Sequence, residues 1–245
     1  MARSTSVGLA AAACWAALVA VLAGCNPGGG VPAPGTSSPA VQVSPGGTSA
    51  PAVPPTSASA VPNPAPPSTA TPPPLPPQVQ QDLDQRLVAA AKANNPALAA
   101  ELIRSGADVN AKDAIQDSAF LYAGAEGFNE ILLLTLANGA DVASTNRFGG
   151  TALIPASEHG HVETVRILIA AGVPVNHVNN LGWTAIQEAV LLNDGGPRQQ
   201  DVVRQLLAAD ADPNIRDPQG RTALQNAERL GFGEIAALIR GVTQK

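Results

Sequence analysis

The stretch from Arg147 to Asn179, RFGGTALIPASEHGHVETVRILIAAGVPVNHVN, decides the fold because it holds one complete structural unit. A short apolar run begins after Thr151, Gly160 interrupts it, and a second amphipathic run extends from Val162 to Ala171. Thr151 suits a helix N-cap, and Gly172 suits the left-handed residue that follows a helix C-terminus. The pattern predicts a helix, a turn, a second helix and a hairpin loop.

This unit recurs on both sides of the central copy. The closing glycine is found at Gly106, Gly139 and Gly172, each 33 residues from the last, and the next equivalent position is Asp210, 38 residues on. The five extra residues fall within Leu191 to Gln200, which is rich in loop formers. The same register aligns helix caps at Ser118, Thr151, Thr184 and Thr222 and first-turn acids at Glu130, Glu163, Asp201 and Glu234. Because one such unit cannot cover its own apolar faces, the units must stack.

The first helix of each unit carries the motif that identifies a family. TALIPA at Thr151, TAIQEA at Thr184, TALQNA at Thr222 and the weaker SAFLYA at Ser118 resemble the T-P-L-H-x-A signature of the ankyrin repeats, whose period is 33. Alanine replaces the family's proline in all four copies, and its histidine is replaced by Leu121, Ile154, Gln187 and Gln225. The resemblance covers roughly Asp82 to Val242 and implies an all-α ankyrin-type solenoid of about five helix-turn-helix units.

These features divide the chain into three parts. We expect a targeting segment at residues 1–24, a disordered linker that begins with Cys25 and covers residues 25–79, and an ankyrin-like repeat domain at residues 80–243. The expected repeats are about 81–112, 113–145, 146–178, 179–216 and 217–243. The first of them has no regular hairpin before its helices, and polar residues suit both terminal repeats as caps.

The amino-terminal segment has the features of a targeting signal. Arg3 is its only charge, Val7 to Val21 is a short apolar core, and Leu22-Ala23-Gly24-Cys25 follows directly. This tetrapeptide resembles the lipobox of bacterial lipoproteins. The resemblance implies cleavage before Cys25, diacylglycerol on the Cys25 thiol and acylation of the new amino terminus. An ordinary secretory signal or an uncleaved anchor is the alternative, although the apolar core is short for a membrane span.

The segment from Asn26 to Val79 has the composition of a tether. It holds 17 of the 23 prolines and no charged or aromatic residue. Such a sequence cannot build an apolar core, so we expect it to stay extended or disordered. A passive spacer is the simplest interpretation. A segment that threads the cell wall, a glycosylated stalk and a ligand for proline-binding modules are the alternatives.

Charge and residue pattern argue against nucleic-acid binding and catalysis. Without the targeting segment the chain has 13 basic and 19 acidic residues, whereas nucleic-acid binding needs concentrated positive charge. His159, His161 and His177 form no helical pair four residues apart, so no metal site is expected. Ser157, Glu158 and His159 are neighbours in sequence and point in different directions on a helix, which argues against a hydrolytic triad. We expect no catalytic residue, no metal and no cofactor.

Protein binding is the remaining class of function. By analogy with the fold, we expect a partner on the concave surface made by hairpin tips and inner helices. The candidate residues in this register are Tyr122, Arg147, Phe148, Glu158, His159, Trp183 and Glu188. Aromatic and arginine side chains dominate binding hot spots, which favours Arg147 and the three aromatic residues. Packing over a neighbouring hairpin is the alternative interpretation of Phe148 and Trp183.

We therefore expect a monomeric protein-binding module, anchored by lipid at Cys25 to the bacterial cell membrane or outer membrane, with its repeats in the periplasm or cell-wall space. Two other functions fit the same sequence. One is an inhibitor or immunity-type protein that neutralises an envelope enzyme or toxin. The other is a structural envelope protein whose proline-rich segment threads the cell wall.

Overall fold

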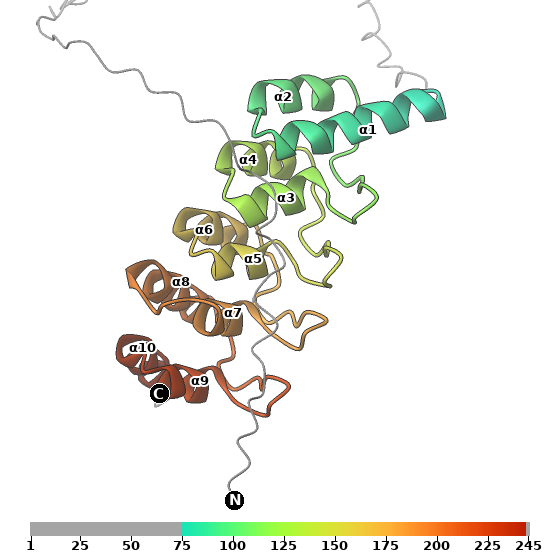
Figure 1. Ribbon diagram of the computed structural model, residues 1–245. Coiled ribbons are helices and arrows are strands. Elements are labelled where there is room, and N and C mark those ends of the chain that lie inside the picture. Colours follow the sequence, from blue (N-terminus) through green and yellow to red (C-terminus); the bar gives the residue numbers. More distant parts are fainter. Residues whose placement is uncertain (1–74, 244–245) are drawn as a thin grey trace, which may run out of the picture. The chain divides into compact units, whose positions relative to one another are not determined.

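The computed structural model describes residues 75–243, so the lipobox, Cys25 and nearly all of the proline-rich segment lie outside the described residues. The described part contains ten helices and no strand. Figure 1 shows these helices as five antiparallel pairs stacked one on the next, with the loops between pairs projecting to one side. The fold is all-α, as the repeat pattern predicts.

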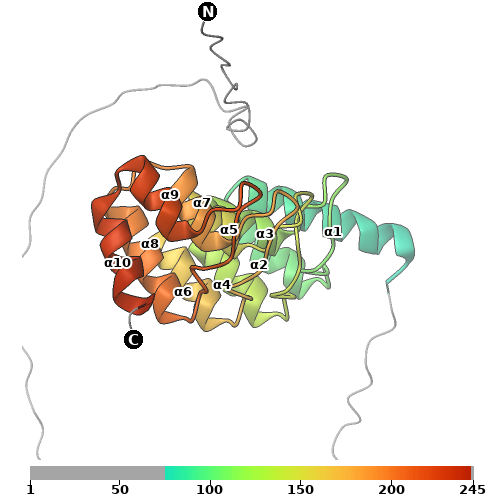
Figure 2. The ribbon, with the colours of Figure 1, turned by 90° about the horizontal axis from the view of Figure 1, so that it is seen from below.

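The helices form two parallel rows (Figure 2), and each helix packs on the next member of its own row. The inner row consists of α1 (Pro77–Lys92), α3 (Ala119–Glu126), α5 (Leu153–Glu158), α7 (Ala185–Leu191) and α9 (Ala223–Leu230). The outer row consists of α2 (Pro96–Arg104), α4 (Asn129–Ala137), α6 (Val162–Ala170), α8 (Pro197–Ala208) and α10 (Gly233–Thr243).

The core runs between the two rows as one continuous layer. Inner helices supply Phe120, Leu153 and Ile186, and outer helices supply Leu132 and Leu206, all almost completely buried. The short inner helices are covered nearly all round, because neighbours pack on two sides and the outer row on a third. A single pair of helices would leave most of this surface in water, and only stacking removes it.

The left-handed residue that ends each second helix lies where the sequence predicts it. Gly106, Gly139 and Gly172 have φ angles of 99°, 83° and 84°, and Asp210 has the same handedness at 61°. Glycine adopts this conformation without the steric cost that a Cβ brings. The 33-residue spacing of these glycines therefore reflects the need for a left-handed residue after each second helix. Asp210 adopts the same conformation.

The predicted helix caps are only partly correct. The side chains of Ser118 and Thr222 accept a hydrogen bond from the third backbone N–H of their helices, but those of Thr151 and Thr184 do not. At Thr151 the physical reason is Pro155, which lacks the N–H that would bond to the Thr151 carbonyl. The N–H of Ile154 bonds to that carbonyl instead, at 3.2 Å, and is no longer available to the hydroxyl. Nothing in the structure explains the case of Thr184.

The five-residue insertion lies partly in a helix and not only in a loop. α8 begins at Pro197 and is 12 residues long, whereas α4 and α6 have 9 residues each. Proline suits the first helical position because its missing N–H has no helical partner there. Asp201 consequently lies beyond the first turn of α8, so its predicted role beside the helix N-terminus is wrong. Glu130, Glu163 and Glu234 do lie in first turns.

Asparagine side chains join successive loops at two junctions. The Asn110 amide donates to the Gly139 carbonyl at 3.0 Å, and its side-chain oxygen accepts the Asp141 N–H at 2.7 Å. Asn176 makes the same two bonds to the following repeat, at 3.2 Å and 2.7 Å. Both polar ends of each amide are thus satisfied, and adjacent repeats are held in register.

The junction between these two lacks the bridge. Ala143 stands where the other junctions have Asn110 and Asn176. Pro174 stands where they have the aspartate whose N–H is bonded by the asparagine oxygen. Because proline has no N–H, an asparagine at position 143 would find no donor there. Other bonds join these loops, from the Asn180 N–H to the Phe148 carbonyl at 2.9 Å and between His177 Nε2 and the Gly149 carbonyl at 2.6 Å.

The first repeat uses helix α1 in place of a hairpin. α1 begins at Pro77, three residues before the expected start of the domain, and its 16 residues make it the longest helix described. From its first turns, Gln80 donates to the Gly106 carbonyl at 2.9 Å and Asp84 accepts the Asp108 N–H at 2.8 Å. These bonds match those made by Asn110 and Asn176, so the extended helix closes the amino-terminal end of the stack.

The close approach of two inner helices gives a test of the packing. A Cβ added at Gly124 would lie 2.7 Å from the Cβ of Ala152. We expect Gly124→Ala to destabilise the protein by about 1 to 3 kcal/mol, because a packed core tolerates an added methyl group poorly. Gly241→Ala is the matched control, since an added Cβ there meets no atom within 4 Å. Urea denaturation of both variants would show the difference, and equal midpoints would contradict the packing.

Candidate functional site

Each regular hairpin is closed by one aspartate or asparagine side chain. In all four the Oδ1 atom accepts two backbone N–H groups, two and four residues further on, at 2.8 to 3.0 Å. The four residues are Asp113, Asn146, Asn179 and Asp217. The third residue after each is left-handed, with φ between 66° and 78°, at Gln116, Gly149, Gly182 and Gly220. The role of these four residues was not predicted from the sequence, although they share the spacing of the closing glycines.

The residue two positions after each closing side chain lies at the hairpin tip. In three successive hairpins it is apolar, and Ile115, Phe148 and Leu181 are here named the tip row. Ile115 is 48% exposed and Leu181 50% exposed, while Phe148 is half-buried. The fourth hairpin has Gln219 at this position. Only Phe148 was a candidate from sequence, because single apolar residues in loops carry no signal until the hairpins are aligned.

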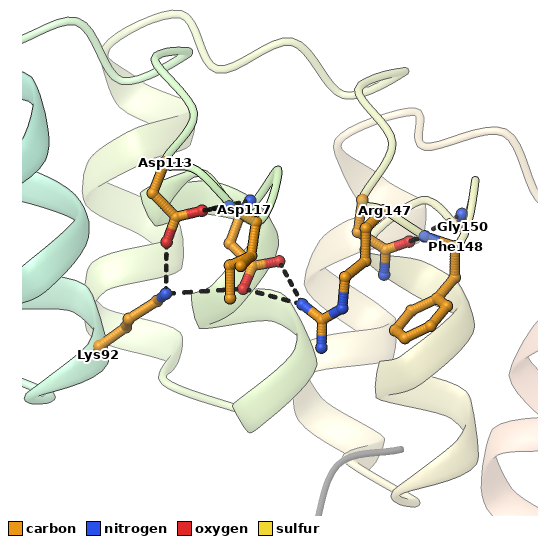
Figure 3. Close-up of polar contacts among 8 residues, drawn as sticks. Lys92, Asp113, Asp117, Arg147, Phe148 and Gly150 are labelled. Carbon is orange, nitrogen blue, oxygen red and sulfur yellow. Dashed lines mark hydrogen bonds and ion pairs between the residues drawn. The ribbon is translucent and has the colours of Figure 1, made fainter.

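Arg147 belongs to a cluster of charged side chains with Lys92, Asp113 and Asp117, and it lies next to Phe148 of the tip row (Figure 3). The Arg147 guanidinium lies 4.6 Å from the centre of the Phe148 ring and 3.4 Å from the Asp117 carboxylate. Lys92 lies 2.5 Å from Asp113 and 3.7 Å from the same Asp117 carboxylate. Both cations thus meet at one buried acid, which orients Arg147 across the aromatic ring.

The two acids of this cluster have opposite pKa shifts. Burial raises the pKa of Asp117, even though the charges of Arg147 and Lys92 lower it. Burial also acts to raise the pKa of Asp113, but hydrogen bonds from Lys92 and from backbone N–H groups outweigh it, so that this pKa is lowered. The buried Asp117 therefore depends on its two cations to carry a charge.

Tyr122 lies on α3 next to the same cluster. It is half-buried, its ring centre is 6.2 Å from that of Phe128, and the Lys92 ammonium is 5.6 Å from the Tyr122 ring centre. Burial raises its pKa, with smaller contributions from Glu126 and Asp117. Tyr122, Arg147 and Phe148, three of the residues proposed from sequence, are thus linked through Lys92 and Asp117.

The other sequence candidates form a second group around α5 and α7. Glu188 is only 5% exposed, and its carboxyl accepts the Asn179 amide at 2.7 Å. Burial, and then the charge of Glu158, raise the pKa of Glu188 to about 8. Trp183 is half-buried, and its indole N–H is buried without a hydrogen-bond partner. Glu188 is therefore almost completely covered and Trp183 partly covered.

Glu158 and His159 end helix α5 at the edge of an open pocket of about 650 Å³. Both are half-buried, and His159 Nδ1 lies 2.9 Å from the Ala125 carbonyl oxygen. Burial raises the pKa of Glu158, which the neighbouring His159 opposes. The far wall of the pocket is the inserted loop, whose contribution was not apparent from the sequence.

His161 is the residue that precedes helix α6, at the turn after α5. Its ring packs against Gly127 of the preceding repeat, and its centre is 5.5 Å from that of His159 in an edge-to-face arrangement. Burial lowers its pKa, with further lowering by His159 and Arg198. Within residues 75–243, no three His, Cys, Asp or Glu side chains are grouped in a way that could hold a metal ion.

Comparison with known proteins agrees with this architecture. Residues 120–217 match the family described as "Ankyrin repeats (3 copies)", and residues 87–114 match "Ankyrin repeat". An ankyrin repeat domain of known crystal structure from Acinetobacter baumannii AYE is 58% identical, with a TM-score of 0.63 over 64% of this chain and 80% of that one. The chain belongs to the ankyrin repeat family.

Two further members are similar to this ankyrin repeat protein. The crystal structure of the ankyrin repeat protein EF0377 is 38% identical, with a TM-score of 0.62 over 66% of this chain and 88% of that one. A segment of 52 residues is 48% identical to YahD of Escherichia coli (strain K12), and covers 21% of this chain and 26% of YahD. The match therefore spans about a quarter of YahD. Proteins of this family generally mediate protein–protein interactions and are typically not catalysts.

The buried carboxyl of Glu188 predicts a pH dependence of stability. Its pKa is about 8 in the folded protein against an ordinary 4.5, so between these values the folded state holds a proton that the unfolded state has lost. Stability should then fall as pH rises through this window, by at most about 1.4 kcal/mol per pH unit. Glu188→Gln should match the wild type near pH 4.5 and exceed it at pH 8. Thermal unfolding at both pH values measures this, and an unchanged slope would contradict it.

Proposed function

We propose that this ankyrin repeat protein is a protein-binding module, held by lipid on Cys25 at the bacterial cell envelope, which contacts its partner through the hairpin tips and the adjoining inner helices. The observation that carries the binding surface is the tip row with Arg147 beside it. Three successive repeats each place an apolar side chain at the hairpin tip, of which Ile115 and Leu181 are about half exposed and Phe148 is half-buried.

The hairpin geometry supports this surface. Each tip residue uses its N–H to bond the closing side-chain oxygen, so its backbone is fixed before any partner arrives. A preorganised contact loses less conformational entropy on binding than a flexible one. Arg147 adds a cation whose position is set by Asp117 and Phe148. Aromatic, aliphatic and arginine groups held in this way are typical of interface hot spots.

The anchor is proposed from the lipobox-like sequence that ends at Cys25. None of the helices in residues 75–243 is both long and apolar enough to cross a bilayer. Two or more acyl chains give stable attachment, whereas a single chain binds weakly and reversibly. The proline-rich segment would then act as the tether between the lipid and a monomeric repeat domain.

The binding surface is tested by the double variant Phe148→Ala/Leu181→Ser. We expect crosslinking to the envelope partner to fall by about tenfold or more, because two hot-spot side chains each contribute over about 1 kcal/mol. Crosslinking in intact cells, followed by blotting for the adduct, measures the loss. Leu133→Ser is the matched control, since Leu133 is 52% exposed on α4 of the outer row. An equal loss of the crosslinked adduct in the control would contradict a binding surface at the hairpin tips.

The anchor is tested by Cys25→Ala. We expect the variant to incorporate no labelled palmitate and to keep its amino-terminal segment, because the thiol that accepts the lipid has been removed. Metabolic labelling and the migration of the protein on gels measure both effects. Processing of the wild type that resists globomycin would count against the lipoprotein assignment.

A further inference from the structure

The loop at the five-residue insertion is held by hydrogen bonds from side chains of the loop and of the first turn of α8. The Asn193 amide donates to the carbonyls of Glu188 and Ala189, at 3.3 Å and 3.5 Å. Its side-chain oxygen in turn accepts the Gln199 amide at 2.8 Å. The Gln200 amide also donates to the Gly195 carbonyl at 2.9 Å. These bonds give the loop a defined shape.

The loop packs against repeats on either side of its own. A Cβ added at Gly160 would lie 2.7 Å from the Gln199 amide nitrogen, and one added at Gly195 would lie 2.5 Å from the Phe232 ring. Between the loop and the end of α5 remains the open pocket of about 650 Å³. Its lining consists of Glu158, His159, Leu192, Asn193, Asp194, Gly196, Pro197, Arg198 and Gln199.

Glu158 is the half-buried acid of this pocket. Among residues 75–243, no side chain donates a hydrogen bond to its carboxyl and no cation pairs with it. The charge of His159 acts to lower the pKa of Glu158, and the charge of Glu158 in turn raises the pKa of Glu188, whose carboxyl is bonded to Asn179. Of the charged residues in the lining, Asp194 and Arg198 are exposed, so a cation entering the pocket would meet two acids and one base.

We propose that this pocket receives an arginine side chain of the protein partner, with Glu158 as the carboxylate that pairs with it. A guanidinium group is planar and can donate two parallel hydrogen bonds to one carboxylate. Leu192 and the His159 ring offer apolar surface to the stem of the side chain, and the Asn193 side chain adds a polar group. The inference rests on the proposed function and names the chemistry of the partner at one position.

Proton release is expected to accompany this contact. Glu188 holds a proton up to about pH 8 because of burial and the nearby Glu158 charge. His159 at the end of α5 acts on Glu158, and Asn179 in the hairpin acts on Glu188, whereas the charged Asp194 and Arg198 of the loop line the same pocket. A guanidinium favours the ionised carboxyls, so its affinity should rise between about pH 6 and pH 9, whereas arginine itself stays charged throughout.

The test compares two probes of nearly the same shape, of which arginine carries a positive charge and citrulline carries none. N-acetyl-arginine amide and N-acetyl-citrulline amide are titrated into the isotope-labelled full chain, and backbone amide resonances are followed by NMR. We expect arginine, and not citrulline, to shift the resonances of Glu158, His159 and Gln199. Equal responses to both probes would refute the pocket, and this comparison needs no variant that has to fold.

Single substitutions then test which carboxyl group pairs with the arginine. Glu158→Gln should weaken arginine binding about tenfold, and Glu188→Gln should abolish the rise in affinity with pH. Glu163→Gln, an exposed acid on α6 paired with Arg166, is the matched control and should leave binding unchanged. An arginine affinity that is unchanged in Glu158→Gln would overturn the inference. If arginine does not bind the pocket but the tip-row variants still lose the crosslink to the envelope partner, the proposed function stands and only the inference about the pocket fails.

Discussion

One side-chain oxygen holds each regular hairpin together. The Oδ1 atom of Asp113, Asn146, Asn179 or Asp217 accepts two backbone N–H groups that the turn would otherwise leave without a partner in the protein. Because these bonds fix the backbone, the side chain at the tip is not needed for the turn. The tip can therefore be isoleucine, phenylalanine, leucine or glutamine in successive repeats, and the same scaffold presents different chemistry.

The closing side chains also reach the inner helices. The Asn179 amide donates to Glu188, and in the next hairpin the Asp217 carboxylate accepts the Asn226 amide at 2.9 Å. The acid and the amide have changed places, yet one donor still meets one acceptor. The exchange has an electrostatic consequence, because it leaves the carboxyl on the helix, where burial and Glu158 raise its pKa to about 8. Glu188 is buried and does not line the pocket, whereas Glu158 and His159 do.

The period and the order of the elements were accessible from sequence because they follow from local rules. Left-handed backbone at Gly106, Gly139 and Gly172 and amphipathic spacing between them need no knowledge of neighbours. The caps at Thr151 and Thr184 could not be assigned in this way. At Thr151, the backbone carbonyl and the side-chain hydroxyl compete for the Ile154 N–H. The carbonyl takes it because Pro155 has no N–H to offer, and this outcome depends on the geometry of the turn.

The candidate surface was only partly accessible for the same kind of reason. Arg147 and Phe148 could be proposed by residue type, but Ile115 and Leu181 acquire meaning only when stacking brings three hairpins into line. Glu188 was proposed as a surface residue, whereas packing leaves it 5% exposed and bonded to Asn179. The sequence by itself determined the repeat, its helices and the acidic character of the domain, because those depend on local conformation and composition. Only the tertiary structure decided which side chains are covered, which cations share Asp117, and that the insertion forms one wall of an open pocket, since those depend on contacts between repeats.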